Sequence, residues 1–339
     1  MTDRKLRLSV LDQSPIRKGS NAVEALQESI QLAQLADRLG YTRYWLSEHH
    51  NTRALAGASP EILIARLAAA TKHIRLGSGG VMLPNHSTLK VAENFRLLEA
   101  LYPGRIDLGI GRAPGGDRLT AHILNPSNNF EPREFVQQVI DLEAYLMETG
   151  EPGSVHDKVK AIPHIDTIPG LWMLTSSGES GLLAARHGWA ISFAHFIHPI
   201  GGPQAVKTYR ERFVPSLFLP QPEANVGIFV FCADTQEKAD ELQAMMDYRL
   251  LSLEKGRFDV YPSYEEVRDY EYTDQELQRV LANRARAISG TPERVKERLL
   301  KLAAEYDVDE IVISSMADKA EDRFRSYELL AQMFSLEGR

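Results

Sequence analysis

The sequence of 339 residues has little that would cross-link the chain or direct it to a membrane. It contains one cysteine, Cys232, so neither an intrachain disulfide nor a cysteine-based zinc cluster can form, and we expect a reducing, cytoplasmic location. No apolar run approaches the roughly 20 residues that cross a bilayer. The first residues, MTDRKLRLSVLDQS, lack the apolar stretch of a signal peptide, so no membrane association is expected.

The chain also lacks an excess of positive charge. It carries 39 lysines and arginines against 46 aspartates and glutamates, which gives a formal net charge of −7. Because neutralising phosphates requires clustered basic side chains, this composition argues against nucleic acid as the main partner. The hydrophobic share of 43% is that of an ordinary folded protein, and the length fits two medium domains or one large barrel.

Short apolar runs alternate with longer helical patterns along most of the chain. We expect eight strands, each followed by a helix, at residues 6–11, 43–47, 74–83, 106–110, 171–174, 189–193, 226–232 and 310–313. Strands separated by helices pair in parallel through right-handed crossovers. Eight such units predict an α/β protein with a closed (β/α)8 TIM-like barrel, in one domain spanning residues 1–339. A doubly wound open sheet is the alternative, although no G-x-G-x-x-G follows the first run.

Two intervals of the chain are too long to be ordinary loops. They cover residues 113–169 and 251–290, and they follow the fourth and seventh expected strands. The second interval is rich in Tyr, Glu and Arg and should contain helices of its own. Because barrels carry their active sites at the C-terminal ends of the strands, we expect both insertions to border the active site.

Histidines follow three of the expected strands. Glu48-His49-His50 ends the second strand, where imidazoles suit proton transfer near neutral pH, although a polar strand end is the simpler explanation. His86 follows the third strand, and His195 and His198 follow the sixth; each fits a lone polar side chain better than a ligand. No H-E-x-x-H or H-x-H spacing occurs, so no metal site is predicted. A metal-dependent hydrolase that uses His49, His50, His195 and His198 is nevertheless the second hypothesis for function.

Glycine and serine clusters mark further candidate ligand contacts. Gly77-Ser78-Gly79-Gly80 lies inside a strand, where glycines indicate a bulge or the close approach of a ligand. The glycine-rich loop after the fourth strand carries one cation, Arg112, which could face an anion or belong to a plain turn. Thr175–Ser180 opens a helix with small hydroxylated residues, as phosphate cradles do; an N-cap accounts for only one of these serines.

These segments together resemble the bacterial luciferase-like family of flavin-dependent oxidoreductases and monooxygenases. The resemblance runs from the first strand to the last, in the order found in the family, and only the two long intervals lack a clear counterpart. It is carried by WLSEHHN, IRLGSGGVMLPNHS, AENFRLLEALYPGRIDLGIGRAPGG, LTSSGESGLLAARHG and SGTPERVKERLLKLAAEYDVDEIVIS.

The resemblance implies a barrel that binds FMN at its C-terminal mouth. The flavin phosphate would lie on Ser176, Ser177 and Ser180, with Arg112 close by. The isoalloxazine ring would lie over the third strand, where the family often has a non-prolyl cis peptide; the matching bond is Gly79–Gly80. His49 aligns with the histidine that the family uses near the reactive edge of the flavin, and Glu48 would orient the strand end.

The implied activity is that of an FMN-dependent monooxygenase. Reduced FMN, supplied by a separate flavin reductase or by NAD(P)H, would react with oxygen, and a small organic substrate would be oxygenated. A deazaflavin is the less favoured cofactor, and a flavin-binding barrel without turnover is the third hypothesis. The resemblance also implies a homodimer, because helices after the second and third strands commonly pack across a two-fold axis in this family. No residue identifies the substrate.

Overall fold

The computed structural model describes residues 5–257 and 259–338, and its centre is a closed barrel of eight parallel strands. The strands follow one another around the barrel in chain order, and the last one pairs with the first. This confirms the predicted (β/α)8 TIM-like barrel and excludes the open sheet. The strands are β1 (Arg7–Asp12), β2 (Arg43–Leu46), β3 (Arg75–Met82), β4 (Ile106–Gly111), β5 (Gly170–Thr175), β6 (Ala190–Ala194), β7 (Ala224–Cys232) and β9 (Glu310–Ser314).

Eight helices surround the barrel and bury one apolar face each against the strands. Outward-facing strand residues such as Leu8, Leu108 and Ile313 meet these faces in one continuous core. The surrounding helices are α1 (Ala22–Leu39), α2 (Pro60–Ala70), α3 (Thr88–Leu101), α5 (Pro132–Met147), α7 (Gly178–His187), α8 (Gly202–Arg212), α12 (Pro292–Tyr306) and α13 (Ala320–Met333). The barrel wall is therefore held by apolar packing between strands and helices along the whole chain.

The insertion after β7 begins earlier than the sequence predicts. Its pattern suggests that helix α9 (Gln236–Glu254) is the barrel helix that follows β7, with the insertion starting at residue 251. Instead, α9 packs on the C-terminal end of β7, where Leu242 and Met246 form a separate apolar cluster with Phe231. The helix that completes the barrel wall is α12, whose Val295 and Leu299 belong to the main core. Both helices have apolar side chains to bury, so the sequence could not tell which one the barrel would select.

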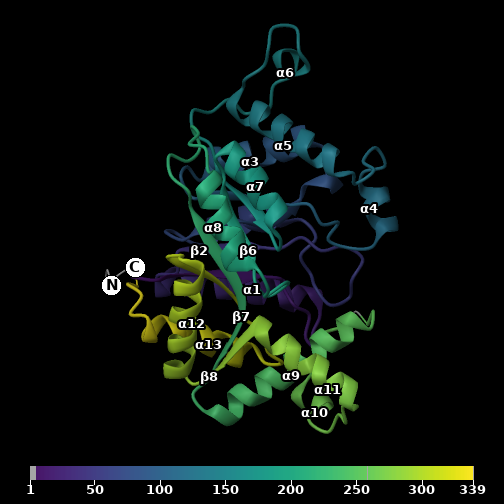
Figure 1. The fold of residues 1–339 in the computed structure, drawn as a ribbon, viewed down its shortest axis with the longest axis vertical. Coiled ribbons are helices and arrows are strands. Elements are labelled where there is room, and N and C mark those ends of the chain that lie inside the picture. The colour runs from purple at the N-terminus through teal and green to yellow at the C-terminus, as the bar shows by residue number, and fades with distance from the viewer. Residues whose placement is uncertain (1–4, 258, 339) are drawn as a thin grey trace.

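The same insertion contains a short strand that the sequence pattern does not reveal. Strand β8 (Ala287–Gly290) pairs in parallel with Phe229–Cys232, the half of β7 that continues beyond the barrel. Four residues are too few for a periodic pattern. The other insertion elements are α10 (Tyr264–Val267), α11 (Asp274–Asn283) and, after β4, α4 (Arg118–Leu124) and α6 (Val155–Lys158). Figure 1 shows α4 and α6 on one side of the barrel and α9 to α11 on the other.

Charged and aromatic side chains fill the interior of the barrel toward the N-terminal ends of its strands. Arg43 donates to Asp107 at 3.0 Å and to Glu310 at 2.9 Å, so side chains from three strands meet across the interior. Above them the rings of Trp45 and Trp172 meet edge to face, with their centroids 5.1 Å apart. Because side chains close this end of the barrel, a ligand has to enter from the C-terminal end of the strands. No helix of the described residues is long and apolar enough to cross a membrane.

Candidate active site

The predicted site residues lie at the C-terminal ends of four neighbouring strands. Glu48, His49 and His50 follow β2, Gly79–Gly80 lies in β3, Arg112 follows β4, and the serine cluster at 176–180 follows β5. Because β2, β3, β4 and β5 are consecutive in the barrel, these segments gather on one side of its C-terminal opening, which we call the mouth. The barrel thus brings segments that are far apart in the sequence to one end.

Glu48 is the centre of a buried hydrogen-bond network. Its side chain is 1% exposed, and its Oε1 lies 2.8 Å from Nε2 of His50 and 2.9 Å from Nε2 of His86. Its Oε2 accepts a hydrogen bond from the backbone N–H of Met82 at 2.9 Å. Burial alone would raise the pKa of Glu48, but the hydrogen bonds from the two histidines outweigh it and hold the pKa at about 2. Glu48 is therefore a carboxylate at neutral pH.

His86 belongs to this network, although the sequence presents it as a lone polar side chain. Its partner Glu48 stands 38 residues earlier in the chain. Burial opposes protonation of His86, but the hydrogen bond and the charge of Glu48 outweigh it and raise the pKa of the imidazole. No local pattern signals such a contact, since only the pairing of β2 with β3 brings the two residues together.

Among the described residues, His49 makes no hydrogen bond to Glu48 and has other partners. Its backbone N–H donates to the carbonyl of Gly57 at 2.9 Å, and its Nδ1 lies 3.1 Å from Oγ of Ser47. Burial lowers the pKa of His49 to about 4; the negative charge of Glu48 opposes this shift, and His50 and Arg249 add to it. The imidazole is therefore neutral at pH 7 and able to accept a proton. Within the described part of the chain, its Nε2 makes no hydrogen bond.

The peptide bond between Gly79 and Gly80 is cis, which confirms the prediction for this bond. The pairing of β3 with β4 shifts register between Gly79 and Val81, so the interpretation of the glycines as a bulge is confirmed as well. A side chain at either glycine would collide with its surroundings. The added carbon would lie 2.8 Å from Cδ1 of Leu11 at position 79, and 2.6 Å from the carbonyl oxygen of Gly109 at position 80.

The start of α7 has the features of an anion cradle. Ser177 is its N-cap, is exposed, and makes no capping hydrogen bond with its side chain. A side chain at Gly178 or Gly181 would meet nothing within 4 Å, so open space borders the first turn. Nη1 of Arg112 lies 3.2 Å from Oε2 of Glu179, which places a cation beside the same turn. Helix N-terminal N–H groups, a hydroxyl that does not cap them and a neighbouring cation together fit a phosphate group.

The other two serines of the cradle differ from Ser177 in exposure. Ser176 is half-buried, just before the helix, and Ser180 is buried in its first turn at 9% exposure. Both lie within four positions of the exposed N-cap, so the three hydroxyls stand along one short segment. The structure therefore brings the predicted serines together at one helix end, with Ser177 the most accessible of them.

The four histidines of the metal hypothesis do not converge. Nε2 of His50 contacts Glu48, whereas Nδ1 of His49 contacts the hydroxyl of Ser47. Nδ1 of His195 lies 2.8 Å from the hydroxyl of Tyr306, and Nδ1 of His198 lies 3.0 Å from the carbonyl oxygen of Ile200. Over residues 5–257 and 259–338, no group of three or more His, Cys, Asp or Glu side chains is arranged to hold a metal ion. The geometry thus gives the metal-dependent hydrolase no support.

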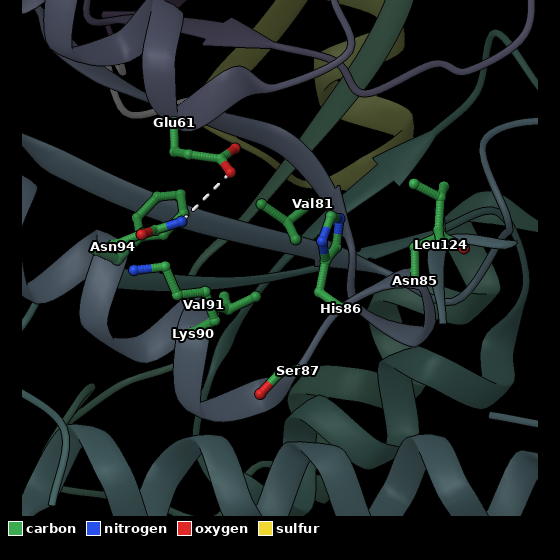
Figure 2. A pocket seen from close by; sticks show the side chains of 10 residues that line it. Glu61, Val81, Asn85, His86, Ser87, Lys90, Val91, Asn94 and Leu124 are labelled. Carbon is green, nitrogen blue, oxygen red and sulfur yellow. Dashed lines mark hydrogen bonds between the residues drawn. The ribbon is translucent and has the colours of Figure 1, made fainter. Parts of the chain in front are cut away.

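A cavity of about 190 Å³ lies beside the barrel mouth, between α2 and α3. Figure 2 shows His86 on one of its walls and Glu61 on another, with the amide of Asn94 donating to Glu61 at 3.3 Å. His86 therefore separates this outer cavity from the buried Glu48. Because α2 and α3 line the cavity and α7 does not, it is distinct from the cradle.

Comparison with known proteins decides the family. Residues 6–309 match the family profile described as luciferase-like monooxygenase. The chain belongs to this family. The expected resemblance is thereby confirmed, and the shared region contains all the predicted site residues.

Several known proteins match this chain over nearly its whole length. The uncharacterized protein YwcH of Bacillus subtilis (strain 168) is 50% identical over 97% of this chain and 99% of its own. The N-acetyl-S-alkylcysteine monooxygenase of the same organism is 36% identical, over 96% of this chain and 97% of its own. The crystal structure of apo-MsnO8 is 38% identical, with a TM-score of 0.91, and the match covers 98% of this chain and 100% of that one.

Proposed function

We propose that the protein is an FMN-dependent monooxygenase that uses reduced flavin and molecular oxygen to oxygenate a small organic substrate. The start of α7 carries this proposal, because the hydroxyl of its N-cap Ser177 makes no capping hydrogen bond and Arg112 pairs with Glu179 in the same turn. Ser176, Ser177 and Ser180 would hold the flavin phosphate there. The flavin ring would extend toward Gly79–Gly80, between the cradle and His49.

The residues of the protein would bind and orient the cofactor, and one of them would accept and return a proton. Bound reduced flavin would supply the electrons that activate oxygen. His49, neutral at pH 7, would accept and return a proton at Nε2 beside the ring. Glu48, held as a carboxylate by His50 and His86, would keep the end of β2 in place. The insertions after β4 and β7 would exclude water from the mouth.

A separate flavin reductase or NAD(P)H would provide the reducing equivalents. The substrate class is suggested by the relative named N-acetyl-S-alkylcysteine monooxygenase, which is similar over nearly the whole chain. We therefore include thioethers among the candidate substrates. A deazaflavin remains the less favoured cofactor.

Anaerobic titration tests the proposal. The protein is titrated with FMN, FAD and a deazaflavin in their reduced forms, and oxygen is then added. We expect FMN to bind at least as tightly as FAD, because the cradle receives one phosphate and no G-x-G-x-x-G segment follows β1 to hold an adenylate. A clear preference for FAD or deazaflavin would contradict the cofactor assignment. Binding of FMN without faster oxidation than in free solution would instead indicate a flavin-binding protein without turnover.

A further inference from the structure

Arg112, the cation of the phosphate cradle, has an anionic partner within the protein itself. Its Nη1 lies 3.2 Å from Oε2 of Glu179, and the two side chains are 42% and 77% exposed. Glu179 is the second residue of α7, and Ser177 is the N-cap of the same helix. A carboxylate in the first turn is also attracted by the positive end of the helix dipole. The same two attractions, from Arg112 and from the helix end, would hold the flavin phosphate.

The backbone that carries Arg112 is fixed on both sides. Arg112 directly follows β4, and three residues later the carbonyl oxygen of Gly115 accepts a hydrogen bond from the backbone N–H of His50 at 3.0 Å. The carbonyl oxygen of Pro114 accepts one from Nδ2 of Asn85 at 2.8 Å. These bonds hold the loop against the segments that follow β2 and β3. Arg112 therefore changes partners by moving its side chain rather than its backbone.

A phosphate that binds in the cradle has to compete with Glu179 for this guanidinium. Carboxylates and phosphates both accept hydrogen bonds from the same N–H groups of arginine. Exposed ion pairs are weak, so a phosphate is able to displace Glu179, but breaking the pair takes away part of the free energy of binding. The displaced carboxylate stays on the first turn of α7, where it repels the phosphate. Both effects lower the affinity of the cradle.

We propose that Glu179 is a built-in competitor of the flavin phosphate, which holds Arg112 and thereby keeps the flavin exchangeable. This inference rests on the proposed function and deepens it, because it makes FMN a co-substrate that is reduced on another protein. Such a flavin enters in its reduced form and leaves after each cycle, so a very tight phosphate site would slow its release. Differences in affinity at one site lie mostly in the dissociation rate.

Glu179→Gln tests the competition, because it keeps the size of the side chain and removes its charge. Reduced FMN should bind about two- to fivefold more tightly to this variant than to the wild type in anaerobic titrations. Stopped-flow displacement should show slower release of FMN by a similar factor. Riboflavin, which lacks the phosphate, should show no gain. Glu321→Gln is the matched control, since Glu321 is an exposed acid at the second position of α13, and it should leave FMN affinity unchanged.

Arg112→Met separates competition from simple repulsion. Without the guanidinium, Glu179 has no shared partner to withhold, so Glu179→Gln should improve FMN binding less in this background than in the wild type. An equal or larger gain there would show that Glu179 only repels the phosphate, and would overturn the inference. An equal gain for riboflavin would overturn it as well. FMN binding that Glu179→Gln leaves unchanged overturns this inference alone, whereas a wild type that binds no FMN overturns the proposed function together with it.

Discussion

Glu48 and His49 are adjacent in the sequence but have opposite electrostatic surroundings. Glu48 is buried among hydrogen-bond donors, which keep it charged, whereas burial lowers the pKa of His49 and keeps it neutral despite the negative charge of Glu48. A carboxylate with a pKa of about 2 is a poor proton donor at neutral pH. We therefore assign proton transfer to His49 and positioning to Glu48.

His49→Ala should impair turnover and spare flavin binding. The phosphate cradle lies at α7, whereas loss of a positioned acid–base group typically costs about 10²–10⁴-fold in rate. His50→Ala should act mainly on stability, by roughly 1–3 kcal/mol, because it leaves the buried Glu48 without one of its donors. Single-turnover traces with reduced FMN and oxygen, a flavin titration and denaturant unfolding compare the two variants. Loss of the oxygen reaction in His50→Ala alone would show that the wrong histidine was assigned.

The low pKa of His49 predicts a pH dependence of stability. The unfolded chain binds a proton at His49 near the ordinary pKa of 6.5, whereas the folded protein binds it only near 4. The free energy of unfolding should therefore fall as the pH is lowered from 6.5 toward 4, and the contribution of His49 should be fully present above 6.5. Between pH 7 and pH 5, the wild type should lose about 2 kcal/mol more than His49→Gln in denaturant unfolding. Equal losses in both proteins would contradict the assigned pKa.

Ser177→Asp should weaken FMN binding, because a carboxylate would stand beside the phosphate. The repulsion should cost about 1 kcal/mol or more, which is about a fivefold or larger rise in the dissociation constant. Ser87→Asp is a matched control, since Ser87 is also an exposed N-cap, of α3, without a capping hydrogen bond. Equal FMN dissociation constants for the two variants would show that the cradle is misplaced.

Among the secondary-structure elements, β3 and β4 approach each other closely because glycines, which have no side chain, stand where the two strands touch. A Cβ at Gly109 would lie 2.2 Å from the backbone oxygen of Ser78, so Gly109→Ala must push the two strands apart. We expect a loss of about 1–3 kcal/mol in the free energy of unfolding. Gly181→Ala, in the interior of α7 with open space around it, should instead be neutral or slightly stabilising. Denaturant unfolding compares the two, and a harmless Gly109→Ala would contradict the packing argument.

For the molecule as a whole, we predict a homodimer formed through α2 and α3. These helices leave Ile62, Leu97 and Leu101 more than half exposed, at 71%, 52% and 57%. Apolar side chains on adjacent helices suit a self-complementary contact across a two-fold axis. Sedimentation at micromolar concentration should give a dimer for the wild type and a monomer for the double variant Ile62→Glu, Leu97→Glu. Leu277→Glu, on α11, is the control and should remain a dimer; a monomeric wild type would refute the prediction.

The pattern of residues along the chain was enough to define the barrel and the chemistry at the ends of its strands. Alternating apolar runs and helices imply eight parallel strand–helix units. In a barrel, the residues that directly follow each strand lie together at the C-terminal end. Glu48, His49, Arg112 and Ser177 were therefore predictable as neighbours of one mouth. The glycine pair in β3 and the serines at α7 carry local signals, because backbone geometry and helix N-termini restrict the residue types they accept.

Only the packed molecule could show which helix completes the barrel and which distant groups reach the mouth. Both α9 and α12 bury apolar side chains, and only their packing shows that α12 forms the wall while α9 covers the end of β7. His86 joins Glu48 across 38 residues. Such contacts leave no periodic trace in the sequence, because they depend on how segments far apart in the chain are brought together in space.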